Sequence, residues 1–142
     1  MYGTIENNDI PFTRDTLNLS TCTFDVLSAI YFCRSMDFNN FKINERIPIT
    51  TIIDNKIYSI YFRYLGKETI ENKDKKKYRC NKFSALMVEG TIFKGGEDIV
   101  VWVTDDDNRI PILVEAKILI GSVKAYFTNA SGLKFPVSSM LN

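Results

Sequence analysis

The strongest constraint on the fold is a run of alternating apolar residues late in the chain. Every second side chain between residues 110 and 120 is apolar: Ile110, Ile112, Val114, Ala116, Ile118 and Ile120. Successive side chains of a β-strand point to opposite faces of the sheet, so a period of two indicates a strand with one buried face. The sequence therefore predicts a sheet-based domain in which this face is buried, largely against a helix.

One helix is predicted, from Thr23 to about Met36. Thr23 fits the N-cap position, and Asp25 in the first turn suits the positive end of the helix dipole. Apolar residues recur at helical spacing along one side, at Phe24, Leu27, Ile30 and Tyr31. Asn39 and Asn40 are expected to end the helix, which then has one face to bury against a sheet.

Alternating apolar and polar residues predict a series of strands after this helix. The expected segments are Phe41–Ile53, a strand from Tyr58 that Gly66 closes, Lys77–Met87, Ile99–Thr104, Ile110–Ile120 and Val123–Phe127. Gly121 marks either a hairpin or a bulge. The connections are too short for parallel crossovers, so the predicted fold is mostly β: a single antiparallel meander sheet with one packed α-helix.

The length of 142 residues suits a single domain. Within it we expect an irregular or short-stranded lead-in over residues 1–20, the helix and meander over 21–130, and a fraying tail over 131–142. The polar start lacks the basic and apolar regions of a signal peptide. Nor does any apolar run approach the roughly 20 residues of a membrane-spanning helix.

Composition excludes several classes of function. Eighteen basic residues balance seventeen acidic ones, so no overall field attracts nucleic acid. The chain contains no histidine, which rules out histidine-dependent nucleophiles, general bases and zinc sites. Cys22, Cys33 and Cys80 lack the spacing of a metal site and are expected to be free thiols, although a bridge from Cys80 to either of the others stays open. We expect no cofactor and no bound metal.

Two charged segments are candidates for a site. The turn Asp105-Asp106-Asp107-Asn108 could hold a divalent cation or raise the pKa of one carboxyl for acid–base catalysis, so a carboxylate- or metal-dependent enzyme is the alternative function. It lacks the ligand spacing of a calcium-binding loop, and aspartate and asparagine are also typical of tight turns. The lysines between Lys73 and Lys77 are interleaved with acidic residues, which favours a solvated hairpin tip over a phosphate site.

Aromatic residues provide the stronger candidate. Tyr58, Phe62 and Tyr64, together with Trp102, could line a groove for an apolar ligand or a lipid chain. The alternative is that they pack beneath the helix as ordinary core residues. Arg34 lies near the end of the helix, where we expect it to reach the carboxylate of Asp105 or Asp106 and tie the helix to the acidic turn.

Two segments resemble the DUF3108 family of exported proteins of Gram-negative bacteria. Residues 24–36 resemble its "Asp-x-Leu-Ser-x-x-Tyr-x-x-Arg" element, and residues 101–111 are similar to its "Trp-x-Ser/Thr-x-Asp-x-x-Arg-x-Pro" turn. Residues 120–123 resemble the glycine step that follows. The resemblance covers about residues 24–130, and the matching positions, interpreted as architectural, are Tyr31, Arg34, Trp102, Asp105, Asp106, Arg109 and Pro111.

The resemblance implies a single twisted antiparallel meander, located in the periplasm or cell envelope, with no established activity. No catalytic residue can be carried over from the family. Its members usually bring a signal peptide and further strands before the helix, so we expect this chain to be the C-terminal part of a longer protein. A meander cut at its start exposes a sheet edge, which favours a dimer. The expected function is a non-enzymatic binding or structural module whose partner is an apolar ligand or an envelope protein.

Overall fold

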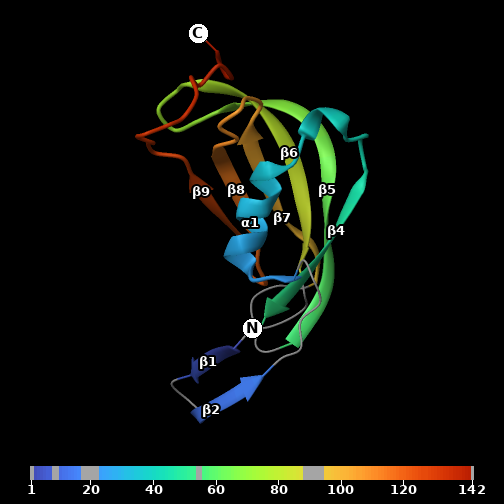
Figure 1. The fold of residues 1–142 in the computed structure, drawn as a ribbon. Coiled ribbons are helices and arrows are strands. Elements are labelled where there is room, and N and C mark those ends of the chain that lie inside the picture. Colours follow the sequence, from blue (N-terminus) through green and yellow to red (C-terminus); the bar gives the residue numbers. More distant parts are fainter. Residues whose placement is uncertain (1, 8–9, 17–22, 54–55, 88–94, 142) are drawn as a thin grey trace.

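The computed structural model describes residues 2–7, 10–16, 23–53, 56–87 and 95–141, and up to residue 16 it describes the backbone alone. Most of the described chain is β-structure. A large curved sheet carries one α-helix in its hollow, and a separate hairpin precedes both (Figure 1). The mostly β fold with one packed helix is therefore confirmed.

Consecutive strands of the large sheet pair side by side. The order is β3 (Thr23–Phe24), β4 (Arg46–Ile53), β5 (Lys56–Glu71), β6 (Lys77–Met87), β7 (Gly96–Thr104), β8 (Pro111–Lys117) and β9 (Ser122–Tyr126). All these pairings are antiparallel except that of β3 with β4, which is parallel. The predicted meander is confirmed, with one short parallel addition made possible by the helix between β3 and β4.

Helix α1 (Val26–Ser35) is shorter at its start than the sequence predicted. Its N-cap is Asp25, whose side chain accepts hydrogen bonds from the backbone N–H and hydroxyl of Ser28 at 2.9 and 2.8 Å. Thr23 instead belongs to β3, so the predicted N-cap is wrong by two residues. Aspartate caps a helix as well as threonine does, and pairing with β4 holds Thr23 extended. A short 3-10 helix, η1 (Phe38–Asn40), follows.

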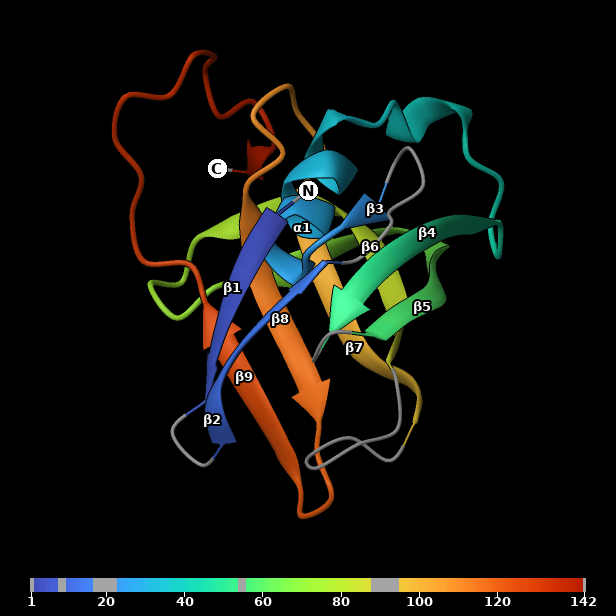
Figure 2. The ribbon, with the colours of Figure 1, turned by 60° about the horizontal axis from the view of Figure 1, so that its bottom comes forward.

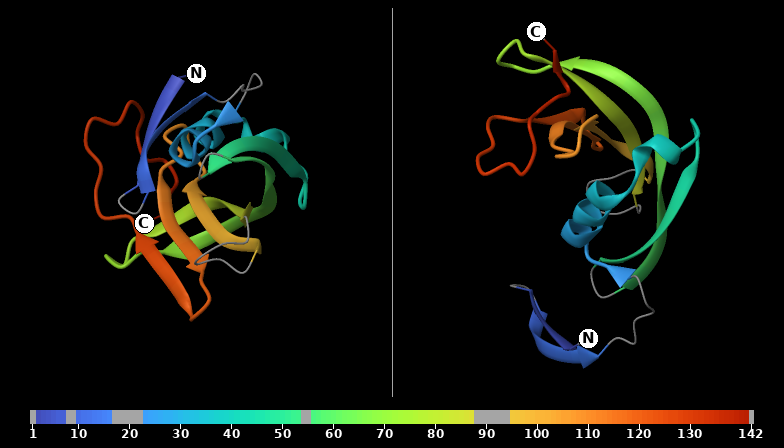
Figure 3. Two further views of the ribbon diagram at one scale, coloured as in Figure 1. Left: turned by 90° about the horizontal axis from the view of Figure 1, so that it is seen from below. Right: turned by 45° about the horizontal axis from the view of Figure 1, so that its top comes forward.

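The lead-in forms a hairpin of its own. β1 (Tyr2–Asn7) pairs antiparallel with β2 (Ile10–Thr16), and the two strands make a sheet separate from the large one. Figures 1 and 3 show this hairpin at one end of the molecule, beyond the N-terminal end of α1. The short-strand interpretation of this segment is therefore the correct one.

A bulge in β5 allows the strand to continue past Gly66. The pairing register with β6 shifts between Tyr64 and Gly66, and Gly66 has a φ of +100°, a conformation that favours glycine. The prediction that Gly66 closes the strand is therefore wrong, because a bulge glycine and a turn glycine look alike in the sequence. β5 and β6 curve along their length, with α1 in the hollow of the curve (Figure 1).

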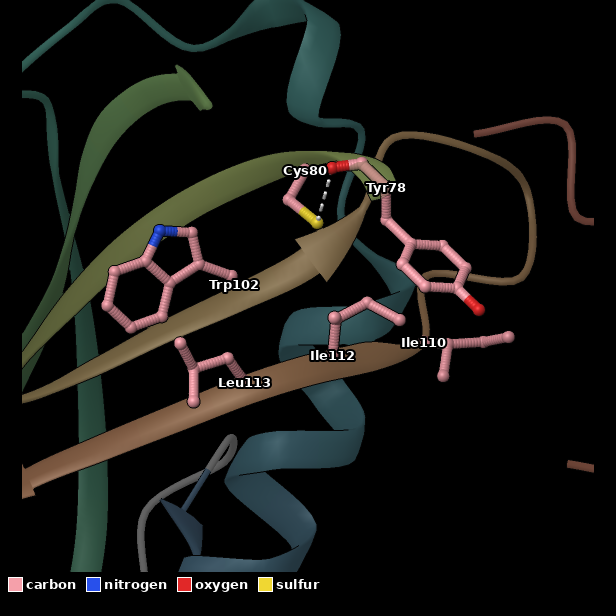
Figure 4. Packing of buried hydrophobic residues seen from close by; sticks show 6 residues of the cluster. All are labelled: Tyr78, Cys80, Trp102, Ile110, Ile112 and Leu113. Carbon is pink, nitrogen blue, oxygen red and sulfur yellow. Dashed lines mark hydrogen bonds between the residues drawn. The ribbon is translucent and has the colours of Figure 1, made fainter. Parts of the chain in front are cut away.

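The core has two parts, one on each face of the sheet. The inner cluster lies on the helix side and contains Phe38, Tyr64, Phe83 and Val103. The outer cluster, drawn in Figure 4, contains Tyr78, Cys80, Trp102, Ile110, Ile112 and Leu113. Ile112 and Leu113 are adjacent yet share this cluster because the register of β7 and β8 shifts between Trp102 and Val103.

The alternating run at 110–120 is therefore only partly buried. Ile110 and Ile112 are buried, but they pack in the outer cluster rather than against the helix, so that part of the prediction is wrong. β8 ends at Lys117, and Ile120 is 90% exposed. The N–H of Ile118 donates to the carbonyl of Gly121 at 3.1 Å, which makes Gly121 part of a hairpin turn.

The C-terminal segment does not fray as predicted. Its strand β10 (Met140–Leu141) pairs with β6, and Ser139 is fully buried. The N–H of Arg79 donates to the carbonyl of Ser139 at 2.8 Å. Sparse apolar residues suggested a loose tail, but backbone and side-chain hydrogen bonds to the sheet hold it in place.

Ile112 and Ile120 belong to the same alternating run but differ in burial, so substituting each one tests whether burial or the pattern determines its contribution to stability. Replacing the fully buried Ile112 by alanine should lower the free energy of unfolding by about 2–5 kcal/mol, because it leaves a cavity in the outer cluster. The matched control Ile120→Ala should change it by less than about 0.5 kcal/mol. Urea unfolding measures both variants, and equal effects would contradict the two-sided core.

Candidate functional site

An apolar cavity lies between the C-terminal part of α1 and the inner face of the sheet. It has a volume of about 50 Å³. Its lining comes from α1, the segment after it and five strands: Cys33, Arg34, Met36, Phe38, Ile47, Phe62, Phe83, Ser84, Ala85, Val101, Val103 and Pro111. Nearly all of these side chains are apolar, so the space is suited to hydrocarbon rather than to ions or water.

Strand register explains why these side chains meet. Phe62 pairs with Ala85, and Phe83 pairs with Val101, so all four point to the inner face. Large aromatic rings flank this region, with the ring centroids of Phe38 and Phe83 4.8 Å apart. The small side chain of Ala85 leaves space between the sheet and α1.

Arg34 closes one side of the cavity and joins α1 to the turn between β7 and β8. Its Nε donates to the carbonyl of Arg109 at 3.0 Å, and its Nη2 donates to the carbonyl of Asn108 at 2.9 Å. In return, Nη1 of Arg109 donates to the carbonyl of Arg34 at 2.7 Å. We call these three hydrogen bonds the arginine latch. The predicted link between helix and turn exists, but its acceptors are carbonyl groups, so the predicted pairing of Arg34 with Asp105 or Asp106 is wrong.

Cys33 lines the cavity as a neutral thiol. Burial raises its pKa to about 12, because a thiolate is poorly solvated there. Burial likewise raises the pKa of Cys80, in the outer cluster, to about 12. Both are free thiols and stay protonated near neutral pH, which makes them poor nucleophiles. Cys22 lies outside the described residues.

The four predicted aromatic residues divide between the two faces. Phe62 lines the cavity, Tyr64 is buried in the inner cluster, and Tyr58 is half-buried on the same face of β5. Trp102 points to the outer face, so its grouping with the other three is wrong, since the register of β7 was not known from the sequence. Its Nε1 donates a hydrogen bond to the carboxylate of Glu68 at 2.9 Å. This bond is the main cause of a lowered pKa of Glu68, and a hydrogen bond from Lys82 lowers that pKa further.

Carboxylates of the acidic turn form ion pairs and hydrogen bonds with other residues of the chain. Asp105 forms ion pairs with Lys67 at 2.8 Å and Arg79 at 2.9 Å, and accepts a hydrogen bond from Asn81 at 3.1 Å. Burial alone would raise the pKa of Asp105, but these bonds outweigh it and lower the pKa. Asp107 is exposed. Among the residues described, no three acidic or cysteine side chains gather as metal ligands.

Asp106 organises the turn and the C-terminal segment. Its Oδ1 accepts from the hydroxyl of Thr104 at 2.9 Å and from the N–H of Asn108 at 3.0 Å. Its Oδ2 accepts from the hydroxyl of Ser139 at 2.7 Å. Burial would raise its pKa, but bonds from Ser139, Thr104 and the backbone outweigh it and lower the pKa. The carboxylate therefore holds the turn and the C-terminal segment together.

The remaining motif positions lie around the same junction. Arg109, at a φ of +49°, places its guanidinium 5.1 Å from the centre of the Phe38 ring. Pro111 lines the cavity. Tyr31 is 68% exposed, and the guanidinium of Arg34 lies 5.6 Å from its ring centre.

A polar cluster on the outer face was not found from the sequence. Glu97 pairs with Arg63 at 2.6 Å and accepts hydrogen bonds from the hydroxyls of Tyr61 at 2.8 Å and Ser84 at 2.5 Å. Alternation along β5 places Tyr61 and Arg63 opposite the aromatic stripe, and that signal was available. Their contact with Glu97, which lies 36 residues after Tyr61 and 34 after Arg63, depends on the pairing of three strands.

The Glu97 cluster should make stability depend on acid pH. The pKa of Glu97 is lowered to about 2, mainly by the hydrogen bond from Arg63. Partial burial opposes this shift, and hydrogen bonds from Ser84 and Tyr61 add to it. A lowered pKa in the folded state means that the cluster stabilises the protein above about pH 4.5 and loses this effect as the pH falls towards 2. Glu97→Gln should therefore unfold at lower urea concentration than the parent at pH 7, and the difference should shrink on acidification. Glu115→Gln is the control, and a constant difference across this range would contradict the assignment.

The arginine latch can be tested by a conservative substitution. Lysine would keep the positive charge of Arg34, but it lacks the planar guanidinium group whose two N–H donors reach the two carbonyl groups. Arg34→Lys should lower the free energy of unfolding by about 1–3 kcal/mol. Arg46→Lys, at an exposed arginine that stacks on Tyr61, should cost less than about 0.5 kcal/mol. Thermal melting of both variants checks this, and an unchanged Arg34→Lys protein would show that the latch contributes nothing.

Within the described parts of the chain, no helix is both long and apolar enough to cross a membrane.

Comparison with curated proteins and with solved structures returned no match. The family model described as "Protein of unknown function (DUF3108)" matches residues 1–128, including the hairpin that precedes the motif-bearing helix. The chain therefore belongs to the DUF3108 family.

Proposed function

We propose that the protein is a non-enzymatic binding module of the bacterial cell envelope that takes up an apolar ligand, such as a lipid acyl chain, between α1 and the sheet. The observation that carries this proposal is the apolar lining of the cavity beneath the helix. Apolar cavities of this kind stay dry and accept hydrocarbon groups.

The chemistry of the lining favours binding over catalysis. Among the described lining residues, the ionisable groups are the thiol of Cys33 and the guanidinium of Arg34. The first stays protonated near neutral pH, and the second is held by two carbonyl groups. Neither provides the paired acid and base that hydrolytic chemistry requires.

The cavity is smaller than its proposed ligand. Sites for small molecules usually enclose roughly 300–1,000 Å³, against about 50 Å³ here. An acyl chain can therefore enter only if α1 moves away from β6 and β7. The arginine latch holds the C-terminal end of α1 against the β7–β8 turn, so opening at this end breaks those hydrogen bonds. The segment beyond Phe38 remains attached to the inner cluster.

The resemblance to exported family members supports a location in the periplasm or cell envelope. A dimer formed through the sheet edge is part of the same proposal, and β9 ends the described strand order with its outer side unpaired by any other described strand. Unpaired strand edges favour association with another chain.

Filling the cavity tests the proposal. Ala85→Val adds two methyl groups at a buried lining position, so it should reduce binding of a fluorescent fatty-acid analogue by roughly tenfold or more, while the protein remains folded. The exposed residue Ala130 provides the control variant Ala130→Val, which should bind like the parent. Fluorescence titration measures affinity, and native mass spectrometry of the purified parent looks for co-purified lipid. If the parent binds no analogue and carries no lipid, the proposal fails; equal binding by both variants would place the site elsewhere.

A further inference from the structure

The hairpin between β8 and β9 carries a second feature that the cavity does not explain. Its turn projects from the body of the sheet in Figures 2 and 3. Around this turn Leu119 is 51% exposed, Ile120 is 90% exposed and Val123 is 56% exposed. Three large aliphatic side chains presented together on a projecting turn form an apolar tip, although such residues are normally scattered over a protein surface.

The charged residues of the turn segment itself are lysines. The eight residues from Lys117 to Lys124 include two lysines and no acidic residue. Lys117 is exposed, and Lys124 is 44% exposed while it pairs with Glu115 at 3.4 Å. Lys117 ends β8 at the turn, whereas Lys124 lies in the middle of β9, so Lys117 is the cation directly beside the apolar end. This arrangement matches an anionic membrane surface, where headgroup phosphates lie above the hydrocarbon.

The size of the tip argues against a stable protein partner. A standard protein interface buries roughly 800 Å² on each side, and a turn of a few residues cannot supply that area. A bilayer surface needs no complementary groove and accepts a convex apolar end.

We propose that the β8–β9 hairpin tip docks reversibly on an anionic phospholipid bilayer. Leu119 and Ile120 enter the interfacial region, and Lys117 and Lys124 contact headgroup phosphates. Because the net charge of the chain is only +1, long-range attraction is small, and binding needs both the aliphatic side chains and the local lysines. This inference does not depend on ligand binding in the cavity beneath α1.

Sedimentation with vesicles tests the docking of the tip. The full chain should sediment with vesicles of phosphatidylcholine mixed with phosphatidylglycerol, more weakly with phosphatidylcholine alone, and less as salt is added. Leu119→Ser with Ile120→Ser should weaken partitioning by roughly tenfold or more. Lys117→Gln with Lys124→Gln should remove the preference for anionic vesicles. Ile43→Ser, at an isoleucine that is 69% exposed elsewhere, is the matched control and should bind like the parent.

A spectroscopic variant gives an independent measurement. The native Trp102 is buried, so it contributes a constant background. A tryptophan introduced as Ile120→Trp should shift its emission to shorter wavelength when anionic vesicles are added. Absence of this shift, or equal sedimentation of the parent and the Leu119→Ser, Ile120→Ser variant, overturns the proposal. So does a parent dimer that the same double substitution converts to a monomer without any change in vesicle binding, since the tip would then be an interface between copies.

Discussion

The carboxylate of Asp106 is the point on which the arrangement of the whole C-terminal half depends. It holds the end of β7 through Thr104, the following turn through the N–H of Asn108, and the C-terminal segment through Ser139. With the turn held in this shape, the carbonyls of Asn108 and Arg109 face Arg34 and accept its hydrogen bonds. A single partly buried carboxylate therefore positions strand, helix and C-terminal segment relative to one another. A carboxylate with several hydrogen-bond donors is stable in its charged form, which fits the lowered pKa of Asp106.

Two register shifts explain how one sheet supports a core on both faces. The bulge at Gly66 transfers the alternation of β5 from one face to the other, so Tyr64 faces α1 while Glu68 reaches Trp102 on the opposite side. The shift opposite Trp102 and Val103 does the same for β8 and puts Ile112 and Leu113 together. Bulges also increase the local twist of a sheet. The curvature that leaves room for α1, and for the cavity beneath it, follows from these positions.

The sequence predicted the elements of this fold better than the contacts between them. Local patterns located β6 at Lys77–Met87, the hairpin tip before it and the acidic turn, because period-two alternation and turn residues act over a few positions. The helix was found, although its cap was misplaced. The sequence did not predict which face of the sheet each side chain occupies. A bulge moves every later residue of a strand to the opposite face, and a glycine such as Gly66 is compatible with either the end of a strand or a bulge within it. For the same reason Trp102 was grouped with aromatic residues of the opposite face, and the partners of Glu97 were missed.

The motif shared with the family is best understood as the junction between α1 and the β7–β8 turn. Arg34 and Arg109 exchange hydrogen bonds there, Asp106 shapes the turn, and Pro111 lines the adjacent cavity. The polar groups of this junction form hydrogen bonds with one another and with backbone atoms. What the junction does leave is an apolar space bounded by a helix that three hydrogen bonds hold at one end. Such hydrogen bonds each contribute only about 1–3 kcal/mol, so a ligand that contacts enough of the apolar lining can offset their loss. Under the proposed function, the same residues that fix the fold also set the free-energy difference between the closed helix and an open helix that accepts a ligand.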